Sequence, residues 1–171
     1  MKKTILTVLL SFLVLSSVSK AEIDLPDGWR YPTKEETTDG LIKWRHEHPN
    51  RFLFIRDDFN GDGVLDESKL LVNDEKDKMA LFVFLSKGKQ YEQIILVEQD
   101  KVWISSMGIQ VASPGKYQTV CGKGYFKCEP GLPDFLTLEN PAIDFFEYAS
   151  ADVYFYWNET SGKFDNMQMS D

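Results

Sequence analysis

Oxygen-bearing side chains alternate in the segment 58–66 with the spacing of a calcium-binding loop. The segment reads Asp-Phe-Asn-Gly-Asp-Gly-Val-Leu-Asp, which puts oxygen side chains at its first, third, fifth and ninth positions and glycine at its sixth. Calcium takes about six to eight hard oxygen ligands, and a tightly wrapped loop points alternate side chains inward. The glycine permits the sharp turn. The predicted ligands are Asp58, Asn60, Asp62, the carbonyl of Val64, and Asp66.

The flanks of this loop differ from those of a helix-loop-helix calcium site. Both flanking segments have strand-like sequences, and Lys69 stands at the twelfth position, where an EF-hand has a glutamate. With its flanks, over about residues 51–86, the loop resembles one FG-GAP or VCBS-type repeat. This is the calcium-bearing unit of integrin-like propellers, in which a strand enters an Asp-x-Asp/Asn-x-Asp-Gly-x-x-Asp loop and apolar strands follow.

The resemblance implies a strand-loop-strand calcium hairpin, with the ligand roles given above. Asp57 and Glu67 are further candidate ligands next to the motif. One repeat does not predict a propeller, because a propeller needs at least about four blades. The alternative is that an Asp/Asn/Gly-rich stretch simply makes a polar turn between two strands. If calcium binds, we expect it to stabilise the structure, since the motif uses its carboxylates as ligands.

No constellation of residues predicts a catalytic site. His46 and His48 are the only histidines, and with no third ligand apparent we expect both to be solvated surface residues. The chain has no nucleophile elbow and no metalloprotease helix motif. Carboxylates are so frequent here that a pair of them carries little information about glycoside cleavage. We therefore predict that the protein is not an enzyme.

The N-terminal residues have the features of a bacterial secretory signal peptide. Two lysines precede an apolar run from Ile5 to Val18, and small residues stand three back and one back from a cleavage site after Ala21. The apolar run is shorter than the roughly 20 residues that span a bilayer, and no cysteine follows Ala21 as a lipid attachment site. We predict a periplasmic or secreted protein without membrane insertion.

The net charge of the exported chain indicates which kind of partner the protein would attract. Removing residues 1–21 would also remove Lys2, Lys3 and Lys20, so that 16 basic residues would oppose 27 acidic ones, a formal charge of −11. Such a surface repels nucleic acid and anionic lipid and attracts basic proteins.

The only two cysteines, Cys121 and Cys128, are predicted to form a disulfide that closes a hairpin. Export would place them where disulfides persist. Closing an eight-residue ring stabilises the fold by about 2.5 kcal/mol on the loop-entropy estimate. A redox pair and half of a zinc site are the alternatives, but redox motifs favour two intervening residues and no further ligand cluster is available.

The remaining 150 residues, 22–171, are predicted to form one mainly β domain: an antiparallel meander that continues as a sandwich or open sheet. Thr33-Lys-Glu-Glu36 is a capping box and predicts one short helix that runs towards Trp44. Short runs of branched and aromatic residues then predict strands. These are 52–55, 69–72, 79–85 and 91–97, which form the meander, followed by 103–105, 117–121, 135–138, 153–157 and 163–169.

The segment 153–157, Val-Tyr-Phe-Tyr-Trp, is unusually aromatic. In a strand its odd-numbered residues share one face, while Tyr154 and Tyr156 share the other. The two tyrosines either back the core or form a binding surface, since tyrosine is enriched in interfaces.

Export, the disulfide and the acidic surface together favour a calcium-stabilised protein that binds another protein. An inhibitor or immunity protein for a basic or cell-wall-degrading enzyme is the leading form of this hypothesis. The alternative is a calcium-dependent adhesion or carbohydrate-binding module.

Overall fold

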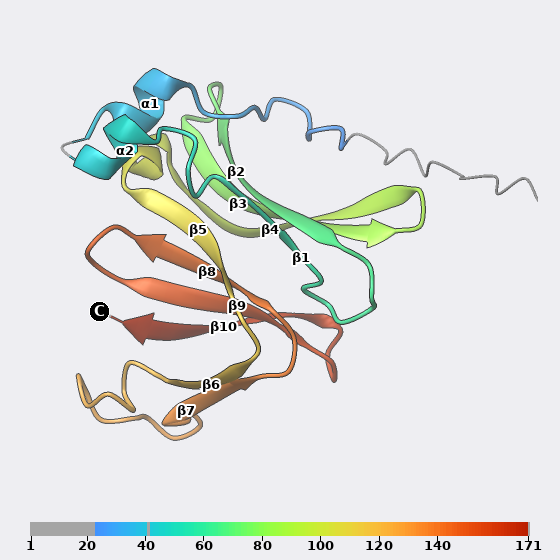
Figure 1. Cartoon of the computed structure of the whole chain (residues 1–171), viewed down its shortest axis with the longest axis vertical. Helices are drawn as coiled ribbons and strands as arrows, with labels where there is room; N and C mark the ends of the chain where they lie inside the picture. Colours follow the sequence, from blue (N-terminus) through green and yellow to red (C-terminus); the bar gives the residue numbers. More distant parts are fainter. Residues whose placement is uncertain (1–22, 41, 171) are drawn as a thin grey trace, which may run out of the picture.

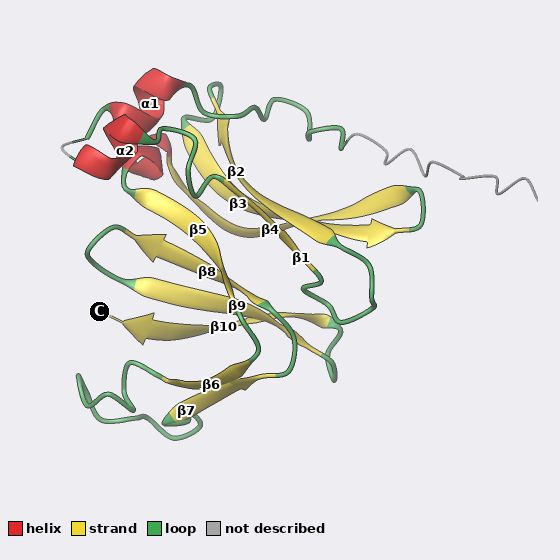
Figure 2. Cartoon of the chain, viewed as in Figure 1, coloured by secondary structure: helices red, strands yellow, loops and turns green. Residues whose placement is uncertain are grey.

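Two four-stranded antiparallel sheets and one two-stranded hairpin make up most of the protein in a computed structural model, which describes residues 23–40 and 42–170 (Figures 1 and 2). The predicted mainly β fold class is confirmed. The predicted signal peptide, residues 1–21, lies outside the described residues. Within the described ranges, no helix has the length and hydropathy needed to span a bilayer.

The first sheet is the predicted meander. It consists of β1 (Phe54–Asp57), β2 (Asp66–Asn73), β3 (Lys78–Lys87) and β4 (Gln90–Asp100), paired in that order. β3 is buried from Met79 to Ser86 because both of its faces are covered. Inward side chains of β3 pack towards the second sheet, and outward ones pack with Trp29 from the N-terminal segment.

The second sheet has the order β10-β9-β8-β5. Its strands are β5 (Met107–Ala112), β8 (Ala142–Glu147), β9 (Asp152–Asn158) and β10 (Lys163–Ser170). The hairpin of β6 (Gly115–Gln118) and β7 (Phe135–Leu138) packs on the outer face of this sheet, where Leu136 and Leu138 contact the cluster that contains Met169. In Figure 1 this hairpin lies on the side of the second sheet that is remote from the first sheet.

Several predicted elements need correction. The predicted strand 103–105 is part of a 3₁₀ helix, η1 (Lys101–Ser105), and the single predicted helix is divided into α1 (Lys34–Thr38) and α2 (Lys43–Glu47). The capping box at the start of α1 is confirmed, because the Thr33 hydroxyl accepts from the Glu36 amide at 3.3 Å and the Glu36 carboxylate accepts from the Thr33 amide at 2.7 Å.

The strands β5 and β8 were not predicted, and each contains a residue that is unfavourable in strands. Gly108 lies in β5, where a Cβ atom would come within 2.4 Å of the Phe146 ring, so the aromatic ring occupies the space of the missing side chain. Asp144 lies in β8 opposite Gln110, which donates to it at 2.7 Å. Both residues are explained by contacts across the sheet that local sequence does not reveal.

The two sheets are joined along one side and separate along the other. Before β1, the Phe52 carbonyl accepts from Ile109 of β5 at 2.8 Å and the Leu53 carbonyl accepts from Leu70 of β2 at 2.9 Å. The main core lies between the sheets. At the far side, within the part of the chain that the structure describes, β4 pairs only with β3 and β10 pairs only with β9. The eight strands therefore form an incompletely closed structure with an opening between β4 and the second sheet.

Candidate functional site: an inter-sheet cleft and the loop 58–66

The loop 58–66 connects β1 to β2 and folds around its own backbone amides. The Asp58 carboxylate accepts from the amides of Asp62 at 3.1 Å and Gly63 at 2.8 Å. The Asn60 side-chain oxygen also accepts from the Asp62 amide at 3.1 Å, and the Asp62 carboxylate accepts from Val64 at 2.8 Å. Gly63 has φ +82°, the left-handed conformation that the predicted turn requires. The first three predicted ligand side chains thus point into the same loop.

Asp66, the last predicted side-chain ligand, has a different environment from the others. Its side chain is fully buried, and its two oxygens accept from the amides of Ser86 at 2.9 Å and Phe59 at 3.1 Å. Burial raises the pKa of Asp66, and the nearby charges of Asp62 and Asp58 raise it further. Asp66 therefore fastens the loop to the end of β3.

No basic side chain neutralises these carboxylates in the described part of the chain, since none of its ion pairs involves Asp58, Asp62 or Asp66. A set of oxygen donors without a basic partner fits the preference of calcium for hard oxygens. Among the described residues, Asp58, Asp62 and Asp66 do not form a group in which one oxygen from each lies within 4.8 Å of the other two. Two oxygens on opposite sides of a calcium ion lie about 5 Å apart, so this spacing is compatible with calcium ligands.

Asp57 and Glu67, the two further candidate ligands, differ from each other in their position relative to the loop. The Asp57 carboxylate accepts from the Asp58 amide at 2.9 Å, at the entrance of the loop. Glu67 shares the outer face of β2 with Lys69, and the two form a buried ion pair at 3.1 Å. Because successive strand residues point to opposite faces, Glu67 points away from Asp66. The structure thus brings Asp57, but not Glu67, to the loop.

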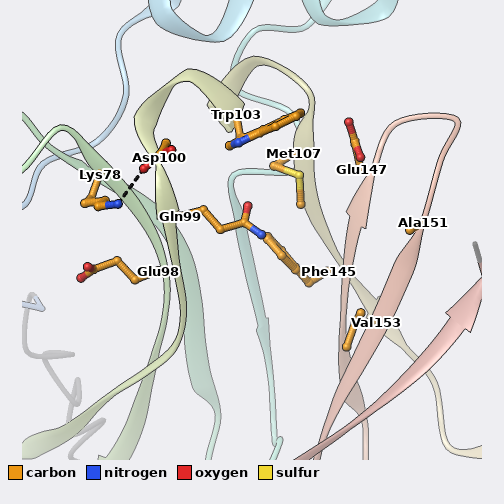
Figure 3. Close-up of a pocket in the computed structure, with 10 residues that line it drawn as sticks. All are labelled: Lys78, Glu98, Gln99, Asp100, Trp103, Met107, Phe145, Glu147, Ala151 and Val153. Atoms are coloured by element: carbon orange, nitrogen blue, oxygen red, sulfur yellow. Dashed lines mark hydrogen bonds and ion pairs between the residues drawn. The ribbon is translucent and has the colours of Figure 1, made fainter.

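A cleft of about 550 Å³ lies between the two sheets on their open side (Figure 3). One wall comes from the end of β4 and from η1, and the other comes from β8 and β9. The side chains of Gln99, Met107 and Phe145 point into the space between these walls (Figure 3). Trp103 lies above them in this view, with 46% of its surface exposed. The lining residues are Lys78, Glu98, Gln99, Asp100, Trp103, Met107, Phe145, Glu147, Ala151 and Val153.

A second hollow of about 410 Å³ follows β4 towards its beginning. It is lined by Glu92, Ile94, Ile95, Leu96, Phe155, Gly162, Lys163, Phe164 and Asn166. The two hollows are neighbours along both strands. On β4 the first is lined by residues 98–100 and the second by residues 92 and 94–96, and on β9 the first is lined by Val153 and the second by Phe155. We refer to both hollows together as the inter-sheet cleft.

Acidic residues belong to the lining of this cleft around an apolar floor. They are Glu92, Glu98, Asp100 and Glu147, together with two lysines, Lys78 and Lys163. Glu98 and Asp100 lie opposite Ala80 and Lys78 of β3, so their side chains share the outer face of the first sheet and point away from Phe145 (Figure 3). Lys78 is engaged by Asp100 at 2.6 Å, and this hydrogen bond raises the pKa of Lys78. In the floor, Phe145, Val153 and Phe155 belong to the main core or pack against it. The cleft therefore combines apolar contact surface with a negative rim.

The aromatic strand of the sequence is β9, and its tyrosines are partly covered. Phe155 is buried in the main core, and Val153 and Trp157 pack against it. Tyr154 and Tyr156 face the other side, where the ring of Tyr154 lies 5.3 Å from that of Tyr117 in β6. This arrangement favours packing over an open binding surface for the two tyrosines.

The predicted disulfide is confirmed, with Cys121 and Cys128 bonded at 2.03 Å. Both cysteines lie within the loop between β6 and β7, so the bridge closes a ring inside that loop and does not join paired strands, as the predicted strand 117–121 had implied. The two histidines belong to the α2 region and are exposed, as expected, and the His46 ring bonds to the Gly40 carbonyl at 2.8 Å.

One buried carboxylate outside the cleft was missed by the sequence analysis. Asp144 lies on the outer face of the second sheet with 5% exposure, and one of its oxygens has no hydrogen-bond partner among residues 23–40 and 42–170. Burial raises the pKa of Asp144 to about 6. The hydrogen bond from Gln110 lowers this pKa, and the nearby charge of Asp152 raises it by a smaller amount. A single aspartate inside a short strand carries no sequence signal of such burial.

Comparison of the chain with known protein families, curated proteins and solved structures found no match. The resemblance of residues 51–86 to an FG-GAP or VCBS-type repeat therefore stays a prediction.

Proposed function

We propose that this chain is an exported, non-enzymatic binding protein that holds a basic protein partner at the inter-sheet cleft and is stabilised by calcium in the loop 58–66. The observation that carries the proposal is the cleft itself, an apolar floor whose lining includes four acidic residues and two lysines, with Glu92 and Glu147 facing inward. Apolar contact provides affinity, and a negative rim steers and selects a cationic partner. An inhibitor or immunity protein directed at a basic enzyme is the form that we favour.

A binding role also accounts for the placement of the acidic groups. Among the described residues, the carboxylates whose pKa is raised are Asp66, in the loop 58–66, and Asp144, on the outer face of the second sheet, and both lie away from the cleft lining. The cleft lining in the described residues contains no histidine, serine or cysteine. These features support binding over general acid–base or nucleophilic catalysis.

Capture of a partner under two salt conditions tests the proposal. Wild-type protein immobilised as bait is expected to retain a basic protein from a periplasmic extract at low salt and to release it at high salt, since salt screens exposed charges. The double variant Glu92→Lys/Glu147→Lys reverses one inward-facing carboxylate in each hollow. We expect it to weaken retention at least about tenfold, equivalent to about 1.4 kcal/mol.

The matched control is Glu75→Lys/Glu129→Lys, which makes the same change of charge at two exposed positions outside the cleft lining. This control is expected to retain the partner. Equal loss of the partner in both double variants would show that only overall charge matters and would contradict the role of the cleft.

The calcium proposal assigns Asp58, Asn60, Asp62, the Val64 carbonyl and Asp66 as the groups that would hold the ion. Calcium at ten times its dissociation constant is expected to stabilise the protein by about 1.4 kcal/mol, or about 3–5 °C in melting temperature for a domain of this size. Asp62→Ala should lose this increment, while the exposed control Asp27→Ala keeps it. Thermal unfolding with calcium and with chelator measures both, and equal increments in the two variants would refute the ligand assignment.

Binding of a carbohydrate is the second candidate, and Trp103 is the observation that favours it. An indole with 46% exposure at the mouth of a cleft can stack on a sugar ring, and Glu147 lies in the same lining. Calcium-dependent retention on peptidoglycan or polysaccharide would favour this candidate over a protein partner. Retention there that does not change after chelation would count against a calcium-dependent module.

A further inference from the structure

The opening between the two sheets is bordered by a long strand with an unpaired edge. β4 extends over 11 residues and, among the described strands, pairs with β3 alone. A β-bulge at Leu96 separates the pairs made by Ile95 and Val97. Among the described residues, no backbone–backbone hydrogen bond outside the β3 pairing involves positions 90–100. The opposite border, β10, pairs with β9, and its carbonyls also accept from outside the sheet: Gln168 from the Val120 amide at 3.2 Å and Met169 from the Lys123 ammonium at 2.6 Å. Backbone donors and acceptors on the open edge of β4 are thus left for another strand.

The two hollows follow this edge rather than crossing it. The first hollow includes β4 residues 98–100 and the second includes residues 92 and 94–96. Because of the bulge at Leu96, positions 92–100 lie opposite eight residues of β3, which at about 3.3 Å per residue gives a groove about 26 Å long. This is the length of an extended segment of about eight residues and exceeds what a compact small molecule fills.

We propose that an extended segment of the basic partner, with alternating apolar and basic residues, adds as a strand to the open edge of β4 and lies in the inter-sheet cleft. This inference rests on the proposed function and specifies how the partner binds. In a strand, alternate side chains point to opposite faces. Apolar ones would meet the floor at Leu96, Phe145 and Phe155, while basic ones would point to the outer face, where Glu98 and Asp100 lie.

The charge of β4 distinguishes this occupant from a second copy of the chain. Within positions 90–100 the strand carries Glu92, Glu98 and Asp100 and no lysine or arginine. Two such edges side by side would bring like charges together across the new pair, which is destabilising. A basic strand instead finds opposite charges at the same positions. The acidic edge thus opposes self-association and favours a cationic segment.

A nine-residue peptide, acetyl-(Lys-Val)₄-Lys-amide, provides the probe. We expect it to bind wild type and to slow amide exchange in residues 92–100 at least about tenfold at saturation, with no change in β1. Two further peptides carry N-methyl groups on one or the other alternate set of residues, which removes the amide donors along one edge of the peptide. At least one of them should bind more than about tenfold more weakly, since the lost bonds are those of strand addition.

The three peptides distinguish strand addition to β4 from binding in the cleft by other contacts. Equal binding of the parent and both methylated peptides, with resonance shifts in the cleft lining, would overturn strand addition and leave cleft binding intact. No shift in the cleft lining with any of the three peptides would overturn both. Slowed exchange in residues 92–100 that appears without peptide as protein concentration rises would assign the edge to a second copy and overturn the proposed occupant.

Discussion

Replacement of Asp144 by asparagine is expected to stabilise the protein by about 3 kcal/mol at neutral pH and by almost nothing at pH 3. The wild-type carboxyl group has a pKa of about 6 in the folded protein and an ordinary value of 3.8. Each pKa unit corresponds to about 1.4 kcal/mol. The folded protein therefore holds the Asp144 proton more tightly than the unfolded chain, and ionisation of this group opposes folding.

Protonation of Asp144 and folding of the protein are linked. The favourable contribution of the neutral Asp144 carboxyl is complete below pH 3.8 and is lost as the pH rises through the folded-state pKa of about 6. Asparagine has nearly the same shape, still accepts from Gln110 and never ionises. Urea unfolding at several values between pH 3 and pH 8 measures the difference between the variant and wild type.

The exposed aspartate Asp27 provides the matched control. Asp27→Asn removes the same formal charge and is expected to change stability by less than about 0.5 kcal/mol at every pH. A stabilisation by Asp144→Asn that is the same at pH 3 and pH 8 would contradict the proposed burial of an ionisable group. A destabilising effect at neutral pH would contradict it as well.

Replacement of Phe59 by alanine is expected to cost about 4 kcal/mol of stability. Phe59 is the second residue of the loop 58–66, yet its side chain is fully buried and belongs to the main core. Removing a buried phenylalanine side chain loses its transfer free energy and leaves a cavity. The Phe59 side chain also holds its backbone amide in place to donate to Asp66. Without this anchor in the core, the loop should lose part of its fixed shape and, with it, the stabilisation by calcium.

Phe54 is the control for this variant, since it lies in β1 with 47% of its surface exposed. Phe54→Ala is expected to cost less than about 1.5 kcal/mol. Urea unfolding gives both free energies from the transition midpoints, provided that the slopes agree. Similar costs for the two variants would show that Phe59 does not anchor the loop in the core.

Local patterns in the sequence predicted the first sheet but only part of the second. The meander β1-β2-β3-β4 joins strands that are consecutive along the chain, so short apolar runs and turns are enough to order them. In the second sheet, β5 pairs with β8 across the whole hairpin of β6 and β7. A pairing of this range depends on contacts such as Gly108 with Phe146, which no local pattern contains.

The candidate site shows the same division. The spacing of Asp58, Asn60 and Asp62 predicted a wrapped loop, because consecutive residues make it. The same spacing could not show that Phe59 anchors the loop or that Asp66 is fully buried. The cleft was not predicted at all, since it combines Glu92 with Glu147 from two different sheets. Its position depends on where the sheets separate, and that is a property of the whole fold.

Binding in the inter-sheet cleft can be observed directly at a methionine in its lining. Met107 lines the cleft, whereas Met167 and Met169 belong to the cluster on the outer face of the second sheet. In protein with ¹³C-labelled methionine methyl groups, the nine-residue Lys-Val peptide is expected to shift the Met107 resonance, in a salt-dependent way, and to leave those of Met167 and Met169 in place. Shifts of Met167 and Met169 with an unchanged Met107 would contradict binding in the inter-sheet cleft.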